Sequence, residues 1–318
     1  MSEQAYLDTL KNIIENGNKK YIYGHDDKHL LSLFGTSIRF DLNKGFPLLT
    51  TKNVFYRGIM EELLWFIKGD NNVKNLATKG VHIWDEWCYK RYKKSDMYKQ
   101  DKLTQEEFIN ELINNNIYNN FGILDGIYGQ QWRKWKASDG REIDQLKWAL
   151  WKLKQPEQRE RKHILVNAWN PQFIYEMSDG NSLELPPCHF SFQLNVANNK
   201  LSCLVNSRSG DAFLGIPFNI ASYAALTMIM AKLSGLELGE LIMSFGDCHL
   251  YSDHLEQAQE QINRIPYPFP ELIIKDRSDM DLDNLTLDDF ELVGYNHHSK
   301  IKAEVTAVGG YDVKQNYR

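Results

Sequence analysis

A strand, turn and strand pattern over residues 190–206 constrains the fold of this chain more than any other feature. Residues 190–196 alternate apolar and polar side chains, as in a strand with one buried face. Residues 197–200, Ala-Asn-Asn-Lys, are typical of a turn, and residues 201–206 predict a second strand. Cys188 stands at the start of this rigid hairpin. Its thiol is interpreted as a catalytic nucleophile, and the alternative is a small buried side chain without chemistry.

Apolar spacing predicts further elements on both sides of the hairpin. Residues 4–15 predict an amphipathic helix, and residues 30–40 predict a strand. Residues 57–68 predict a helix that ends before Gly69. Residues 220–233 are apolar nearly all round, which predicts a helix buried in the core.

The helix predicted at residues 57–68 carries two adjacent carboxylates in different settings. Glu62 shares a helix face with Ile59 and Phe66, which are apolar. Burial of a carboxylate on such a face costs free energy, so a functional role is the more favoured explanation. Glu61 is expected to face outward and pair with Arg57. Glu62 is therefore a candidate catalytic residue, and the alternative is an ordinary charge on a helix surface.

Composition predicts one main domain. The chain has 318 residues, of which 42% are hydrophobic, so it can bury one large core. Residues 88–125 are charged and rich in Asn, and they predict a small surface insertion with a short helix over residues 103–114 capped by Thr104. The four cysteines lack the paired spacing of zinc or redox sites, so we expect no metal and no disulfide framework.

The net charge of −5 gives no reason to expect nucleic acid as a partner. No segment is expected to approach the roughly 20 apolar residues of a membrane span, and the beginning of the sequence lacks a secretory pattern. These observations predict a cytoplasmic protein with no membrane partner.

Motifs along most of the chain resemble the thymidylate synthase family. In chain order they are residues 46–52 (FPLLTTK), 61–66 (EELLWF), 83–87 (IWDEW), 128–129 (YG), 185–189 (LPPCH), 207–211 (SRSGD), 213–223 (FLGIPFNIASY) and 246–251 (GDCHLY). Only residues 88–125 and 308–318 lie outside the resemblance. Several long motifs in register are far more specific than one short pattern.

The resemblance implies an α/β fold in which a large mixed sheet packs against helices. It also implies a homodimeric enzyme that transfers a one-carbon unit from 5,10-methylenetetrahydrofolate to C5 of a uridylate, without a metal. The first expectation is conversion of dUMP to dTMP with release of dihydrofolate.

The resemblance also assigns roles to individual residues. The implied catalytic residues are Cys188, Glu62, His189, Asn219 and Tyr128. The implied nucleotide-binding residues are Arg208, Ser209, Asn219, His249, Tyr251 and, from the partner subunit of the dimer, residues equivalent to Arg161, Lys162 and His163. The implied folate-binding residues are Trp84, Trp87, Asp211, Gly215 and Lys52.

Chemistry supports several of these roles. A thiolate that adds at C6 of uracil makes C5 nucleophilic, and the Arg208 cation is expected to favour the thiolate of Cys188 and to hold a phosphate. The Asn219 amide can donate to O4 and accept from N3–H of uracil, although Asn before an apolar helix is also an ordinary N-cap. His249 and Tyr251 lie two apart on an extended segment, so both can reach a sugar hydroxyl. For Arg208 the alternative is a surface salt bridge, and for the aromatic residues it is simple core packing.

Three departures from the family pattern concern the nucleotide phosphate and closure of the site. The loop at residues 23–28 (YGHDDK) lacks the family's arginine. Two adjacent arginines are replaced, before a strand predicted at residues 164–169, by Lys162 and His163, or by Arg161 and Lys162 if one residue is inserted. The tail continues to residue 318, beyond the usual end of the family. A small residue, Ala212, also follows Asp211.

These departures keep two other functions open. A pyrimidine nucleotide hydroxymethylase would add water in place of hydride and form 5-hydroxymethyl-dUMP, -UMP or -CMP for base modification or nucleoside antibiotic synthesis. An RNA-binding regulator would need a concentrated basic patch, for which residues 159–162 are the one candidate.

Overall fold

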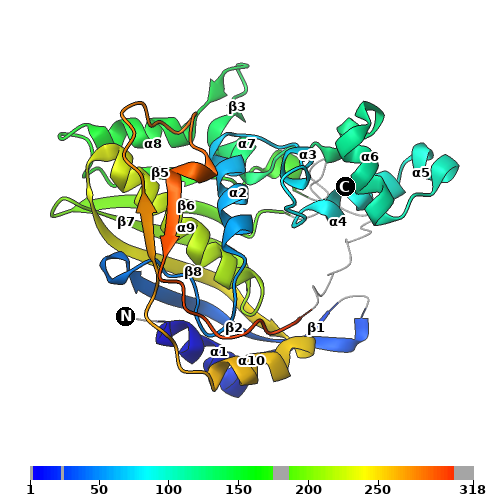
Figure 1. Ribbon diagram of the computed structural model, residues 1–318, viewed down its shortest axis with the longest axis horizontal. Coiled ribbons are helices and arrows are strands. Elements are labelled where there is room, and N and C mark those ends of the chain that lie inside the picture. The colour runs from blue at the N-terminus through cyan, green and yellow to red at the C-terminus, as the bar shows by residue number, and fades with distance from the viewer. Residues whose placement is uncertain (1–2, 23–24, 175–185, 304–318) are drawn as a thin grey trace. The chain divides into compact units, whose positions relative to one another are not determined.

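The computed structural model describes residues 3–22, 25–174 and 186–303 (Figure 1). The chain divides into two compact units. Among the described residues, the sheet unit comprises residues 3–22, 25–59, 147–167 and 188–303, and the helical unit comprises residues 60–146, 168–174 and 186–187.

The sheet unit is built on a six-stranded mixed sheet. In spatial order its strands are β1 (Asn18–Ile22), β2 (His25–Asp41), β8 (Glu237–Tyr251), β7 (Lys200–Asp211), β6 (His189–Ala197) and β5 (Leu165–Asn167). All neighbouring pairs are antiparallel except β7 and β8, which are parallel. The mixed sheet and the α/β class are therefore confirmed. A small antiparallel pair, β9 (Glu271–Ile274) and β10 (Phe290–Val293), belongs to the same unit.

Helix α9 (Gly215–Ser234) connects the two parallel strands and packs against both. A parallel pair needs such a crossover, because a short turn cannot return the chain to the same end of the sheet. α1 (Gln4–Asn16) packs on β2 and β8, and α10 (Leu255–Ile262) lies beside α1 (Figure 1). The remaining elements of the unit are α8 (Gln145–Lys154), which begins in the helical unit, η1 (Leu42–Lys44), η5 (Ser252–His254) and η6 (Leu287–Asp289).

Along β7 the side chains alternate between the core and the opposite face of the sheet. Leu201, Cys203 and Val205 are fully buried, whereas Ser202 and Leu204 between them keep partial exposure. This alternation follows from the two-residue period of a strand. The face of the sheet opposite the buried side chains therefore remains accessible in the single chain.

The hairpin predicted from the sequence is confirmed. β6 and β7 pair from Ala197 and Lys200 onward, and the two turn residues Asn198 and Asn199 have φ of 50° and 62°. Asn tolerates this left-handed backbone better than most residues, and two such residues in a row match the right-handed twist of the strands. β7 continues to Asp211, beyond the predicted end at residue 206.

α9 differs from its prediction in two respects. It begins at Gly215 and not at residue 220, because Pro217 lies in the first turn, where a missing N–H costs nothing. α9 also has the length and composition of a membrane span, so the expectation that no segment approaches one is wrong. Most of that span is buried inside the structure, as is usual for a core helix.

The helical unit contains α2 (Tyr56–Ile67), which begins in the sheet unit, and a series of short elements. They are α3 (Lys74–Ala77), α4 (Asp85–Lys93), α5 (Asp96–Asp101), α6 (Gln105–Asn114), η2 (Asn116–Gly122), α7 (Tyr128–Arg133), β3 (Trp135–Lys136), β4 (Glu142–Ile143) and η3 (Pro171–Phe173). Thr104 caps α6 as predicted, in a reciprocal capping box with Glu107. Residues 88–125 enclose buried aromatics, among which Tyr92 and Phe108 stack with ring centroids 4.6 Å apart.

Candidate functional site

The hairpin places Arg208 of β7 beside Cys188, which immediately precedes β6. The Arg208 N–H donates to the Cys188 carbonyl oxygen at 2.8 Å, and Arg208 Nη2 lies 3.8 Å from Cys188 Sγ. Next to the cysteine, β6 has one extra residue relative to β7, since His189 pairs with Ser207 and Ser191 pairs with Asn206. A β-bulge of this kind redirects side chains at the end of a strand.

The pKa of the Cys188 thiol is shifted in the direction opposite to the one that Arg208 alone would produce. Burial raises the pKa of Cys188 above its ordinary value, whereas the Arg208 guanidinium lowers it and the Asp211 carboxylate raises it. The cation therefore acts in the expected direction, but burial outweighs it. The resting protein holds Cys188 mainly as a thiol, so reaction requires further stabilisation of the thiolate.

His189, the next residue, is buried and bound to α9. Its Nδ1 lies 2.8 Å from the Tyr223 hydroxyl, and the two rings are perpendicular with centroids 5.2 Å apart. Burial lowers the pKa of His189 to about 3, so the imidazole is neutral at physiological pH. His189 can therefore form hydrogen bonds near the thiol, but it does not carry a positive charge there.

Asn219 lies inside α9, just after its first turn, so the N-cap alternative for this residue is wrong. Its side chain is partly exposed, and none of the described residues hydrogen-bonds its amide. The start of the helix is served instead by Asp211, whose Oδ1 accepts from the N–H groups of Phe213 and Leu214 at 2.9 and 3.2 Å. Asn219 thus keeps both donor and acceptor for a ligand, and Gly215 is the first residue of the helix.

Buried donors hold the turn between Asp211 and α9. The Tyr6 hydroxyl donates to the Ala212 carbonyl at 2.9 Å, and Lys52 Nζ donates to the Phe213 carbonyl. Burial lowers the pKa of Lys52 to about 7, although the Asp211 and Glu3 carboxylates act in the opposite direction. The Lys52 side chain is buried, and its amino group points into the protein toward the Phe213 carbonyl. Ala212 is also buried.

The loop that carries Lys52 is held by a buried carboxylate at the beginning of the chain. Glu3 accepts hydrogen bonds from the backbone N–H groups of Thr50 and Thr51 at 2.7 and 2.9 Å and from both threonine hydroxyls. Gln261 of α10 also donates to the Thr51 hydroxyl at 2.8 Å. A buried carboxylate is tolerated only with such partners.

His249 and Tyr251 lie side by side near the end of β8, as predicted from their spacing. Their rings are perpendicular with centroids 5.1 Å apart, and both residues are largely buried. Within the described chain, neither His249 Nε2 nor the Tyr251 hydroxyl has a hydrogen-bond partner. In the parallel register Asp211 pairs with His249 and Ser209 pairs with Asp247, so these strands bring the predicted nucleotide residues together.

Arg161, Lys162 and His163 are exposed residues that precede β5, which is shorter than the predicted strand at residues 164–169. No described carboxylate forms an ion pair with Arg161 or Lys162. The Lys162 carbonyl accepts from Gln193 at 2.6 Å, and the His163 ring lies 5.9 Å from that of Trp148.

In the helical unit, Glu62 is bound to an aromatic cluster. Trp84 Nε1 donates to Glu62 Oε1 at 2.8 Å, and the Trp84, Phe66 and Tyr128 rings contact one another with centroids 5.1–6.4 Å apart. Burial raises the pKa of Glu62 to about 7, and the hydrogen bond from Trp84 opposes this shift. Although the side chain keeps some exposure, its carboxyl has the protonation behaviour of an acid–base group at neutral pH.

Glu61 and Trp87, which adjoin this cluster in the sequence, differ in how far they are buried. Glu61 is buried and its carboxylate pairs with Lys79 at 2.6 Å, so the expectation of an outward-facing Glu61 is wrong. Trp87 is partly exposed, with Lys90 Nζ 4.3 Å from its ring centre.

Sequence reasoning missed Tyr223, Tyr6 and Asp247. Tyr223 ends the matched motif at residues 213–223, but its hydrogen bond with His189, like that of Tyr6 to Ala212, joins residues far apart in the sequence, and no local pattern reveals such a contact. Asp247 stood within the matched motif two residues before His249, and that spacing was a usable signal. Residues 23–24, Leu185 and the tail from residue 304 lie outside the described residues, as do the side chains at 25–27, so the departures at the loop and tail stay predictions.

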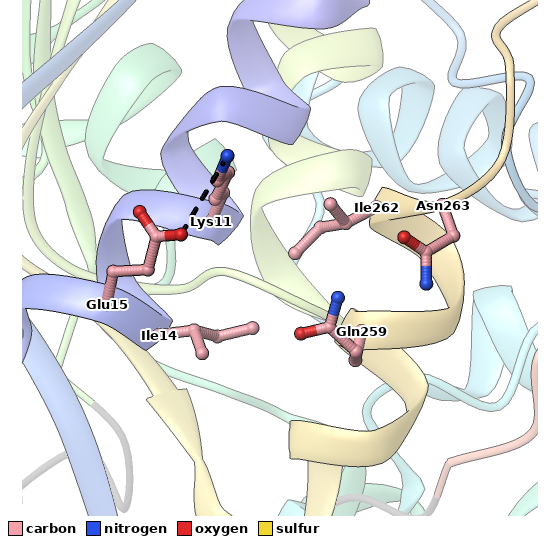
Figure 2. A pocket seen from close by; sticks show the side chains of 6 residues that line it. All are labelled: Lys11, Ile14, Glu15, Gln259, Ile262 and Asn263. Atoms are coloured by element: carbon pink, nitrogen blue, oxygen red, sulfur yellow. Dashed lines mark ion pairs between the residues drawn. The ribbon is translucent and has the colours of Figure 1, made fainter.

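A surface pocket between α1 and α10 contains none of the predicted site residues (Figure 2). It is lined by Lys11, Ile14, Glu15, Gln259, Ile262 and Asn263. Lys11 and Glu15 form an ion pair with each other at 3.8 Å, and both are more than half exposed. Elsewhere in the described chain, no group of three His, Cys, Asp or Glu side chains is arranged to hold a metal.

Comparison with known proteins agrees with this arrangement. Residues 4–307 match the thymidylate synthase family. Proteins named thymidylate synthase from Listeria monocytogenes serotype 4a (strain HCC23) and serotype 4b (strains F2365 and CLIP80459) are each 40% identical over 327 aligned residues. These alignments cover 95% of this chain and 99% of each relative. With its hairpin thiol, its aligned motifs and these relatives, the chain belongs to the thymidylate synthase family.

Proposed function

We propose that this protein converts dUMP to dTMP, with 5,10-methylenetetrahydrofolate as the one-carbon donor and dihydrofolate as the second product. The enzyme is a methyltransferase of the thymidylate synthase family that uses methylenetetrahydrofolate as cosubstrate. The observation that carries the proposal is the Arg208 guanidinium 3.8 Å from the Cys188 sulfur, in a chain that matches the family over residues 4–307.

Cys188 is the nucleophile of the proposed reaction. Its thiolate adds to C6 of the uracil ring, which gives C5 the electron density to attack the one-carbon unit. Loss of the C5 proton with elimination of tetrahydrofolate leaves an exocyclic methylene at C5, which accepts a hydride from the tetrahydrofolate. The folate is thereby oxidised to dihydrofolate, and the C6–S bond breaks to release dTMP and the Cys188 thiolate. Arg208 stabilises the thiolate, and with Ser209 it binds the nucleotide.

Glu62 is the acid–base group of the proposed reaction. A group with a pKa of about 7 exchanges protons readily at physiological pH, and the indole N–H of Trp84 orients one of its carboxyl oxygens. His189, which is neutral, contributes hydrogen bonds near the thiol, and Tyr128 belongs to the aromatic cluster around Glu62.

Asn219 is proposed to select uracil. Its amide has no partner in the described chain, so it can donate to O4 and accept from N3–H at the same time. Cytosine offers the opposite pattern at that edge. The folate is proposed to contact Trp84, Trp87, Asp211, Gly215 and Lys52, although Lys52 Nζ must first leave the Phe213 carbonyl.

The enzyme is further proposed to be a cytoplasmic homodimer in which each subunit supplies Arg161, Lys162 and His163 to the nucleotide phosphate of the other. The Arg161 and Lys162 side chains are exposed, and neither has an ion-pair partner among the described residues. The sheet also has apolar residues on its accessible side, such as Leu204 and Ile242, together with Leu165, which is 42% exposed. Burial of such surface favours association.

The product distinguishes this proposal from a nucleotide hydroxymethylase. Mass spectrometry of the product from dUMP and methylenetetrahydrofolate should show a methyl group, with dihydrofolate formed in equal amount and followed by absorbance. A product heavier by one oxygen, with tetrahydrofolate returned, would establish the hydroxymethylase. Absence of any product together with RNA binding through residues 159–162 would favour a regulator.

A further inference from the structure

Asp247 is the centre of a hydrogen-bonded array that joins three strands. Its carboxylate accepts from Lys20 Nζ of β1, from the Ser32 hydroxyl of β2 at 3.0 Å and from His249 Nδ1 on its own strand at 3.0 Å. Exposure falls along the array, since the side chains of Lys20, Asp247 and His249 are 46%, 27% and 8% exposed. The array therefore runs from the surface to an almost buried imidazole.

The array determines which nitrogen of His249 carries the proton. A carboxylate can only accept hydrogen bonds, so the His249 nitrogen that faces Asp247 must donate. Burial raises the pKa of Asp247, but the hydrogen bonds from His249, Lys20 and Ser32 outweigh it and hold the pKa well below its usual range. Asp247 is thus an anion at every physiological pH, and in the neutral imidazole the lone pair is left on Nε2.

We propose that Asp247, held by Lys20 and Ser32, is a positioning residue that presents His249 Nε2 as an acceptor for a hydroxyl group of the nucleotide sugar. The inference rests on the proposed function, because it takes His249 to contact the nucleotide. Tyr251 complements this arrangement, since its hydroxyl can donate to the same sugar oxygen. The pair therefore suits a free hydroxyl and disfavours a phosphate ester or a keto group, neither of which can donate to Nε2.

The other titratable groups around the imidazole do not supply an alternative partner for Nδ1. Tyr251 presents its ring to His249, and Asp211 pairs with His249 across the parallel strands through the backbone, where the Ala212 N–H donates to the His249 carbonyl at 2.7 Å. Asp247 is thus the group that sets the tautomer.

The direct test is the tautomer of His249, measured by NMR on protein with ¹⁵N-labelled histidine. The chain has nine histidines, and the His249→Gln variant assigns the signal. We expect the wild-type protein to carry the proton on Nδ1. In Asp247→Asn the amide can donate to Nδ1, so we expect the proton to appear on Nε2.

The functional test is the affinity for dUMP relative to 2′,3′-dideoxyuridylate, which lacks sugar hydroxyls, measured by calorimetry. A hydrogen bond of ordinary strength predicts a preference of about tenfold for dUMP in the wild-type protein. Asp247→Asn should remove most of this preference, and Lys20→Met should reduce it several-fold. Lys19→Met is the matched control, because it removes the same charge from the neighbouring position of β1, where the Lys19 ammonium group lies over the Tyr21 ring and not against Asp247.

The two measurements separate failure of this inference from failure of the proposed function. Nδ1 protonation in the wild-type protein with loss of the hydroxyl preference in Asp247→Asn supports the inference. A proton on Nε2 in the wild-type protein, or an unchanged preference in Asp247→Asn, overturns it, even if dTMP is formed. Absence of turnover with the tautomer and preference as expected would refute the proposed reaction and leave the positioning role of Asp247 intact. Because Lys20 is half-exposed, its variant gives an answer even if Asp247→Asn does not fold.

Discussion

Burial and the Arg208 cation shift the pKa of the Cys188 thiol in opposite directions, and no sequence motif shows which effect is larger. The motif predicted the pair of Cys188 and Arg208, and the structure places their side chains together. The size of the burial effect was not predictable, because it depends on every atom packed around the sulfur. The same holds for His189, whose low pKa follows from burial alone.

Removal of the Arg208 cation should make Cys188 less reactive. In Arg208→Gln the pKa of Cys188 is expected to rise further, so alkylation by iodoacetamide at neutral pH should slow by about tenfold for each pKa unit. Cys88, Cys203 and Cys248 are buried, so the reaction reports on Cys188. Arg39→Gln is the control, because Arg39 pairs with Glu240 on the same sheet. An equal alkylation rate in Arg208→Gln and the wild-type protein would contradict this account.

Glu62 should make the stability of the protein depend on pH. The pKa of Glu62 in the folded protein is about 7, above the ordinary glutamate value of 4.5, so the unfolded chain releases this proton at lower pH. The favourable contribution is complete below about pH 4.5 and is lost as pH rises through about 7. Glu62→Gln should therefore stabilise the protein by on the order of 2 kcal/mol at pH 8 and by much less at pH 5.

Urea denaturation at the two pH values measures this difference. Glu61→Gln is the matched neighbour, and it should give no such gain, because Glu61 is already paired with Lys79. A Glu62→Gln variant whose stability relative to wild type is the same at pH 5 and pH 8 would show that the carboxyl titrates normally.

Elements defined by local pattern were predicted well, and those that depend on distant contacts were not. The β6–β7 hairpin and the Thr104 cap follow from residues adjacent in the sequence. The start of α9 was predicted five residues late because Pro217 and Gly215 resemble a loop when read alone. The turn that leads into the helix is held by hydrogen bonds from Tyr6 to Ala212 and from Lys52 to Phe213, and both donors lie far earlier in the chain.

The turn between β6 and β7 gives a prediction about this element. Asn199 has φ of 62°, which a β-branched side chain adopts only with strain, so Asn199→Val should destabilise the protein by about 1–2 kcal/mol. Asn199→Gly should change stability by no more than about 0.5 kcal/mol. Asn195→Val, in the exposed part of β6, is the control, since strands accept valine. Equal denaturation midpoints for the two valine variants would contradict the prediction.

At the scale of the whole molecule, the order of the strands could not be derived from local pattern. The α/β class and mixed sheet were implied by the family resemblance and are confirmed. The placement of β8 between β2 and β7 depends on pairings between segments more than 200 residues apart, such as Leu30 with Tyr251. The predictions of one main domain and of a surface insertion at residues 88–125 stay predictions.

The proposed dimer predicts complementation between inactive subunits. Cys188→Ser lacks the nucleophile, and a subunit with Arg161, Lys162 and His163 all changed to alanine lacks the proposed contribution to its partner. Mixing the two after reversible dissociation should restore activity, because each mixed dimer contains one site with all its residues intact. Light scattering checks the mass of the assembly. Activity no greater than the sum of the two unmixed variants would rule out sites shared between subunits.

The place of β8 in the sheet has a consequence for how the protein is made. β1 and β2 leave the ribosome early, and β6 and β7 follow as a separate ribbon, but the strand that joins them is synthesised only at residues 237–251. Until then both ribbons carry an open edge, and α1 lacks the strand β8 and the helix α10 against which it packs. A nascent chain of this protein therefore remains exposed to aggregation for most of its translation, and a product that stops before residue 237 has no route to the finished sheet.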